Sequence, residues 1–590
     1  MVIPRILLAA LAVSASLLAQ QARWNLPLGG LVTYTADEAL EPDPPRGILP
    51  GCPLPHATIL LQSELAPEGT HVATEPPDWR WIAPFLAFDL RLGAAGRVGT
   101  TLGRVPGLGT LEFSGTAGHK SPDGTQVFDL TFKVVPPALP ADEKKLQSTD
   151  PRPWYGGEGK GTLKLERTVD AAAGVVREFR ATLTLDITFG PHHGKSAFAG
   201  TFTQHWQVLE VLGYRAPGFA ARVARAIQDG ADVIAHELEF DRPDLATRND
   251  NDHLCGEGRL ALCLQTLLAA ERSPDSPKVR AGFEELYRRD LRETYSLSVA
   301  LLATEQAHTP PLERDNLLRG IIGKPTPRVL PAAEQRRVAE WTERLLKNRD
   351  ESLDQAYRSR WWYFGGKGFD NSNSQYALLG LWSASLCQQQ VPRGVWLAAA
   401  EHWLAVQHSP FGRSRGLQLV PLAAMTDQGL AVLARSGSAR TATPRGFCYT
   451  LPGSGPAYGS MTCAGIVGMS LCRAALDAGP GKATALDGKL DEAIRSAFAW
   501  LAAHRTVRWN AGPPPSRNQH FFYWLYSLER ACELSRTGLI DDWDWYHEGA
   551  QVLLSLQDVH GKFGHANFEE QCFAILFLKK AQLPVLTGPR

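Results

Sequence analysis

The sequence predicts two domains: a β-rich, sandwich-like or open-barrel domain over residues 24–212, then an all-α domain over residues 215–585. At 590 residues the chain is too long for one ordinary domain. Apolar and polar residues alternate in the first part, and apolar residues recur with helical spacing in the second. Apolar and amphipathic helices then recur as pairs, close to six times, which favours a closed (α/α)6 toroid over an open solenoid.

The β-rich part is predicted from its alternation. The segment "GVVREFRATLTLDITFG", residues 174–190, alternates over a long run, and "GTLKLERTVD", residues 161–170, does so after Gly-rich sequence. Clusters of Pro and Gly such as "EPDPPRGILPGCPLP" separate such runs. No catalytic motif stands out in this part, so function is sought in the helical one.

The helical part contains segments that are apolar nearly all round, and such helices must be buried on most sides. They are residues 257–271, 293–306, 373–385, 461–476, 521–534 and 570–582. Amphipathic segments such as "WLAVQ", "WLAAH" and "LLSLQ" lie between them. This alternation predicts an inner set of buried helices surrounded by an outer, half-exposed set.

The net charge and the N-terminal residues indicate which classes of partner and which cellular location to expect. Lys plus Arg and Asp plus Glu both number 61, so the chain lacks the basic excess of nucleic-acid-binding proteins. Residues 1–20 combine Arg5 with a short apolar run and small residues, which predicts a signal peptide and a secreted or periplasmic protein. A retained N-terminal anchor is the alternative. No later run is long enough to predict a membrane span.

Several helical segments resemble those of a known family. "QDVHGKFG", residues 557–564, is similar to the Gln…Gly-x-Trp motif of squalene–hopene-type cyclases, with Phe563 in the Trp position. "FDNSNSQYALLGLWSA" and "SMTCAGIVGMSL" resemble squalene-cyclase-type repeats of exported bacterial proteins. The resemblance covers residues 215–583 and extends to protein prenyltransferase β subunits. It implies the terpenoid cyclase/prenyltransferase type of α/α toroid, which also hosts proteins without catalysis.

The catalytic motifs of these enzymes are missing from the sequence. Such cyclases protonate an alkene with an Asp-x-Asp-Asp motif, and "DDWDW", residues 541–545, has its acids in another order. Its acids precede a helix, so we expect them to cap it. Prenyltransferases hold zinc through Asp-x-Cys and a later His, and no Asp-x-Cys occurs here. "CGEG", residues 255–258, lacks the glutamine of a thioester motif.

Asp370 is the most ambiguous candidate, because it precedes a run of good helix-cap residues in "FDNSNSQYALLGLW". We expect it to cap this helix. The alternative places Asp370, Asn373 and His520 at a cavity mouth as catalytic or ligand-contacting residues. No cofactor is predicted; a zinc ion held by Cys463, His520 and Cys572 is the alternative to buried, packing cysteines. Aromatic residues expected to line a cavity are Tyr295, Tyr376, Trp382, Tyr523, Trp524 and Phe573.

The sequence therefore predicts a ligand-binding or scaffolding protein of the cell envelope. Its partner would be an apolar small molecule or another protein, since aromatic concave surfaces bind apolar or extended ligands. The alternative is a cyclase-like or prenyltransferase-like enzyme that acts on an isoprenoid or lipid through an unrecognised site.

Overall fold

The fold was analysed in a computed structural model of the whole chain. The structure describes residues 31–41, 56–60, 82–100, 104–105, 109–135, 158–170, 175–188, 197–212, 217–238, 258–350, 359–366, 368–410, 412–422, 439–477, 485–512, 520–564 and 566–581. The predicted signal peptide (residues 1–20), Cys52 and Cys255 lie outside the described residues.

The chain forms two compact units, a β-sheet unit and a helical unit. The first contains the residues up to Arg222 together with Leu554–Val559, and the second contains Val223–Leu553 and the residues from His560 onward. An N-terminal β-sheet region followed by a helical region agrees with the two-domain prediction.

The β-sheet unit is built on one eight-stranded sheet in the order β2-β1-β10-β9-β8-β7-β6-β5. All of its paired neighbours run antiparallel. The strands are β1 (Leu31–Glu41), β2 (His56–Leu60), β5 (Arg104–Val105), β6 (Gly109–Lys120), β7 (Gln126–Val135), β8 (Glu158–Asp170), β9 (Val175–Thr188) and β10 (Ala197–Leu212). Consecutive strands from β5 to β10 are neighbours, as short connections favour.

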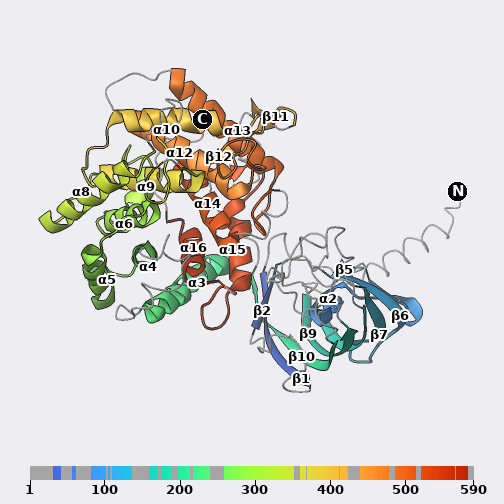
Figure 1. Cartoon of the computed structure of the whole chain (residues 1–590). Helices are drawn as coiled ribbons and strands as arrows, with labels where there is room; N and C mark the ends of the chain where they lie inside the picture. The colour runs from blue at the N-terminus through green and yellow to red at the C-terminus, as the bar shows by residue number, and fades with distance from the viewer. Residues whose placement is uncertain are drawn as a thin grey trace, which may run out of the picture. The chain divides into compact units, whose positions relative to one another are not determined.

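Within the described residues this is a single sheet that wraps around helix α2 (Ile82–Asp89), and no second large sheet stacks on it. The sandwich-like prediction therefore differs from the structure (Figure 1). Alternate residues, such as Leu163 and Leu165 on β8, face a core that also contains Phe88 of α2. A helix covers the apolar face that a second sheet would cover in a sandwich, and alternation alone does not distinguish the two.

Among the described residues of the helical unit, six inner helices contact one another in a closed cycle. Each contacts the next along the chain, and the last, α16, contacts the first, α4. The inner helices are α4 (Gly258–Ala269), α6 (Thr294–Ala307), α9 (Asn371–Leu386), α12 (Gly459–Asp477), α14 (Phe521–Leu534) and α16 (Phe568–Lys579). These are the six segments predicted from their apolar character.

Amphipathic helices alternate with the inner ones and pack on their outer side. Helix α5 contacts α4, α8 contacts α6 and α9, and α10 and α13 both contact α12. The helices between and around the inner set are α3 (Pro217–Glu237), α5 (Pro277–Arg288), α7 (Glu313–Leu318), α8 (Ala332–Lys347), α10 (Arg393–Val406), α13 (Ala485–Ala503) and α15 (Trp545–Leu556). This is the predicted alternation of buried and half-exposed helices.

Small residues allow the helices to approach closely. A Cβ atom on Gly468 of α12 would lie 2.2 Å from Nε1 of Trp403 on α10, so only glycine fits there. Helix α12 is long and apolar enough to cross a membrane by length and composition, and 94% of its apolar window is buried within the chain. The sequence pattern of α12 is thus also that of a buried core helix.

Short strands and turns complete both units. In the helical unit, β11 (Arg415–Leu417) pairs with β13 (Arg440–Ala442), and β12 (Leu419–Pro421) pairs with β14 (Thr537–Ile540). In the β-sheet unit, β3 (Arg91–Leu92) pairs with β4 (Val98–Gly99) across the 3-10 turn η3 (Ala94–Gly96).

Candidate functional site: a tyrosine-lined cavity

A cavity of about 960 Å³ lies in the helical unit, at the N-terminal ends of the inner helices. Every inner helix contributes lining residues from its first two turns. Four helices contribute a pair spaced four residues apart, which places both side chains on one helix face. These pairs are Gly258 and Leu262, Tyr295 and Val299, Ser372 and Tyr376, and Glu569 and Phe573. The cavity therefore depends on the shared register of the inner helices.

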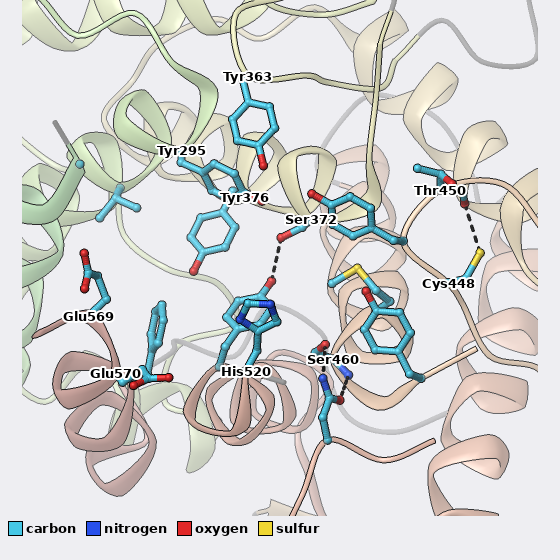
Figure 2. A pocket seen from close by; sticks show the side chains of 18 of the residues that line it. Tyr295, Tyr363, Ser372, Tyr376, Cys448, Thr450, Ser460, His520, Glu569 and Glu570 are labelled. Carbon is cyan, nitrogen blue, oxygen red and sulfur yellow. Dashed lines mark hydrogen bonds between the residues drawn. The ribbon is translucent and has the colours of Figure 1, made fainter. Parts of the chain in front are cut away.

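Tyrosine rings form much of the wall. Tyr295 meets Tyr376 edge to face at 5.0 Å between ring centroids, and Tyr376 stacks with Tyr523 at 6.4 Å. Tyr523 in turn lies 5.6 Å from Phe573. Figure 2 shows Tyr295 and Tyr376 beside the cavity, with Glu569 and Glu570 on one side of the view and Cys448 and Thr450 on the other. Such rings give apolar faces with hydroxyl tips.

Hydrogen bonds fix several of the polar tips. The hydroxyl of Tyr523 lies 3.1 Å from Oγ of Ser372 and 3.2 Å from Oε1 of Gln375. Elsewhere in the wall, Nδ2 of Asn510 donates to Oγ of Ser460 at 3.0 Å, and Oδ1 of Asn510 accepts from the Ser460 amide. Rigid side chains of this kind preorganise a binding site.

Ionic and capping contacts hold the side of the cavity formed by α4 and α16. Arg259 of α4 forms an ion pair with Glu569 of α16. Asn567 and Glu570 form a capping box at the start of α16, with Glu570 N donating to Asn567 Oδ1 at 2.9 Å. These acidic side chains lie at a helix N-terminus, where the helix dipole favours negative charge.

Asp370 caps α9, as the sequence predicts. Its Oδ1 accepts from the amide of Asn373 at 2.6 Å, and its Oδ2 accepts from Nδ2 of the same residue at 2.8 Å. The next residue, Asn371, ties the helix start to the cavity wall: its amide donates to the carbonyl of Tyr449 and its side chain to that of Cys448, both at 2.8 Å.

The Asp370 carboxyl is fully buried yet reaches the cavity through Tyr449. Its interaction with the nearby Tyr449 hydroxyl and its hydrogen bonds with the start of α9 favour the ionised form, but burial is the larger effect and raises its pKa to about 6. Tyr449 is 38% exposed, lines the cavity and also interacts with Tyr363, another residue of the lining. Burial and the Asp370 charge raise the pKa of Tyr449, so its hydroxyl keeps its proton.

This environment bears on catalysis. A carboxyl with a raised pKa is a weaker acid than an ordinary aspartic acid, so Asp370 is poorly suited to protonating an alkene. It is better suited to accepting a proton near neutral pH, through the hydroxyl of Tyr449. Asp370 therefore differs in chemistry from the acid that a squalene-type cyclase needs.

The structure separates the predicted site residues into two groups. Tyr295, Tyr376, Tyr523, Phe573 and His520 line the cavity. Asp370 and Asn373 lie buried behind its wall, Trp524 is buried beside Gly459, and Trp382 is half-buried on α9. A ligand contact by any of these residues stays a prediction.

The cysteines and histidine considered for zinc are not brought together. Among the described residues, no group of three or more His, Cys, Asp or Glu side chains is arranged to hold a metal ion. Cys572 lies 3.9 Å from Cys263 by their Sγ atoms, whereas His520 faces the cavity.

The acids of "DDWDW" have structural roles. Oδ1 of Asp544 accepts from the amide of His547 in the first turn of α15, as predicted for a cap. Asp541 forms an ion pair with Arg415 and accepts from the amide of Gln418 at 2.8 Å. Asp541 therefore joins the start of α15 to the loop around β11 and β12 rather than capping the helix.

Sequence analysis missed the loop that completes the wall. Residues 448–458, "CYTLPGSGPAY", contribute Tyr449 and Tyr458 to the cavity. The available signal was a Gly-, Ser- and Pro-rich segment with two tyrosines directly before an inner helix.

Comparisons with protein-family models, with curated proteins and with solved structures found no match to this chain.

Proposed function

We propose that the helical unit is an α/α toroid of the terpenoid cyclase/prenyltransferase type that binds a small molecule in its tyrosine-lined cavity. The closed cycle of contacts among the inner helices supports the toroid. The observation that carries the function is the cavity itself, because about 960 Å³ lies within the range of small-molecule sites.

The wall favours a ligand with an apolar body and a few hydroxyl or carbonyl groups. Each tyrosine offers an apolar ring and a polar tip, and aliphatic side chains such as Leu262 and Val299 add apolar surface. The charged side chains of the wall are partly compensated, since Glu569 pairs with Arg259. A neutral, amphipathic molecule therefore suits this wall better than a strongly charged one.

An enzyme is the second candidate, on the strength of the Tyr449 hydroxyl near the buried Asp370 carboxyl beside the cavity. In that case Tyr449 would carry a proton between a bound hydroxyl and the buried carboxyl, as a general base does. The reaction would still act on an isoprenoid or lipid, as the sequence resemblance implies. If the cavity binds no ligand, the remaining proposal is that the protein acts as a scaffold.

The proposal is tested with two probes that share one carbon chain: farnesol, which carries a hydroxyl, and β-farnesene, which lacks it. Titration calorimetry should give several-fold tighter binding of farnesol, because one paired hydroxyl contributes about 1 kcal/mol. Leu262→Trp places an indole ring in the cavity wall and should weaken binding of both probes. Val329→Trp adds the same bulk at a side chain that is 82% exposed and should leave binding unchanged.

Two results would count against the proposal. Equal binding by wild type and Leu262→Trp would place the ligand elsewhere on the chain. Absence of binding by both probes, together with a purified protein that carries no additional mass, would favour scaffolding.

We further propose export to the periplasm or the cell exterior, on the basis of the signal-like residues 1–20. Expression of the full chain in a bacterial host, followed by N-terminal sequencing of the mature protein, tests this. Cleavage after about residue 20 supports export, and an intact Met1 in the cytoplasm contradicts it.

A further inference from the structure

We propose that Cys263 and Cys572 form a disulfide bond that covalently closes the cycle of inner helices. Both side chains are fully buried, and their Sγ atoms lie 3.9 Å apart across the α4–α16 contact. The sulfur atoms must approach by about 2 Å to reach bonding distance, a change that side-chain rotation and small helix shifts can supply. This inference does not rest on the proposed ligand.

The α4–α16 contact differs from the others in the cycle, because its two helices are not consecutive along the chain. The two cysteines are 309 residues apart in sequence. Every other pair of inner neighbours is consecutive along the chain, and the longest of their connections runs from Leu386 at the end of α9 to Gly459 at the start of α12. A cross-link that closes a long loop restricts the unfolded chain most, so this position gains most from a covalent bond.

Two ion pairs hold the same contact in register on either side of the cysteines. Arg259 pairs with Glu569 near the helix starts, and Nζ of Lys579 lies 2.5 Å from Oε1 of Glu271 near the helix ends. Across the three contacts, Arg259–Glu569, Cys263–Cys572 and Glu271–Lys579, the residue numbers rise together on both helices, so α4 and α16 run parallel. This alignment keeps Cys263 opposite Cys572.

Oxidation removes one hydrogen from each thiol, that is, two protons and two electrons in total. A disulfide oxidant such as glutathione disulfide accepts the two electrons. One cysteine thiolate attacks it and forms a mixed disulfide. The second cysteine thiolate then attacks the sulfur of the first cysteine and displaces glutathione. Two molecules of glutathione are released. Burial and the neighbouring Cys572 thiol raise the pKa of Cys263, so the folded Cys263 thiol forms little thiolate. The bond should therefore form during folding, once α4 and α16 have met but before the core closes around the two thiols.

The test refolds the full chain in a buffer of reduced and oxidised glutathione and, in parallel, under reducing conditions. After alkylation in denaturant, the oxidised sample should contain two fewer reactive thiols and a peptide pair linked through Cys263 and Cys572. It should also unfold at a higher temperature than the reduced sample. Cys263→Ser should lose this gain in unfolding temperature. Cys472→Ser, the matched control, should keep it, because Cys472 is buried but not in sulfur contact with another cysteine in the described residues.

Two outcomes would overturn the inference. One is complete alkylation of both Cys263 and Cys572 after oxidative refolding. The other is a cross-link that joins either residue to a different cysteine, which would show that the α4–α16 contact does not select its partner. Because the peptide map is made on the wild-type chain, a variant that fails to fold does not obscure the result.

Discussion

The buried charges of Arg167 and Asp370, one in each unit, have different surroundings. In the β-sheet unit, the buried guanidinium of Arg167 donates to Gln126 and to the carbonyls of Ala87 and Leu90, and it lies over the ring of Phe128. In the helical unit, the buried carboxyl of Asp370 forms hydrogen bonds but no ion pair among the described residues. The hydrogen bonds of Arg167 fasten α2 to the sheet, whereas the Asp370 carboxyl lies beside a cavity.

This difference suggests why each group is present. Buried charges with complete partners are often structural, and removing them leaves other groups unpaired. An aspartate at a helix start could be replaced by asparagine, which caps equally well without a charge. A carboxyl whose pKa is strongly raised by folding is typical of functional sites.

Arg167→Met is expected to have the largest effect. It leaves the carbonyls of Ala87 and Leu90 and the amide of Gln126 without their donor, at a cost of about 3–5 kcal/mol. Hydrogen–deuterium exchange should accelerate in peptides of β7 to β9 and stay unchanged in the inner helices. Arg177→Met, which removes an exposed ion pair with Asp170, is the control and should change little. Equal loss of protection in both units would contradict this local role.

Asp370→Asn is expected to stabilise the protein at pH 8. Because folding raises the pKa of this carboxyl from its ordinary value of 3.8 to about 6, its ionised form costs about 3 kcal/mol above pH 6. The penalty disappears as pH falls from 6 towards 4, so wild type and variant should converge there. Urea unfolding at pH 8 and pH 4.5 measures the difference.

The groups around Asp370 do not obscure this test. Tyr295, Tyr449 and Tyr523 have raised pKa values, and burial lowers the pKa of His402 to about 3, so all four stay neutral between pH 4.5 and 8. In the β-sheet unit, hydrogen bonds from Thr125 lower the pKa of Asp123, so Asp123→Asn should have the opposite sign. A loss of stability in Asp370→Asn at pH 8 would make the carboxylate a structural group.

Tyr449→Phe is expected to have the smallest effect on stability and a clear effect on binding. Loss of the hydroxyl that joins the cavity to Asp370 should weaken farnesol binding up to about tenfold. Tyr546→Phe removes a hydroxyl that donates to the Leu578 carbonyl away from the lining, and it should leave affinity unchanged. If both variants bind farnesol with equal affinity, the Tyr449 hydroxyl does not contribute to ligand binding.

The inner helices and the Asp370 cap were predictable because they are local patterns. Helical spacing could also have corrected the predicted wall: Ser372 and Tyr376 share a face, whereas Trp382 lies about 240° around the helix from Tyr376. Trp524 is likewise turned about 100° from Tyr523. Tyr449 was not predictable, because contacts with Asn371, 78 residues earlier in sequence, place its loop in the wall.

Native mass spectrometry of the full chain, purified gently from its own compartment, tests the cavity proposal most directly. Wild type and Val329→Trp should carry an additional mass of a small molecule that is depleted in Leu262→Trp, since the tryptophan takes part of the cavity. A bare polypeptide mass in wild type, or an undiminished additional mass in Leu262→Trp, would contradict ligand binding in the tyrosine-lined cavity.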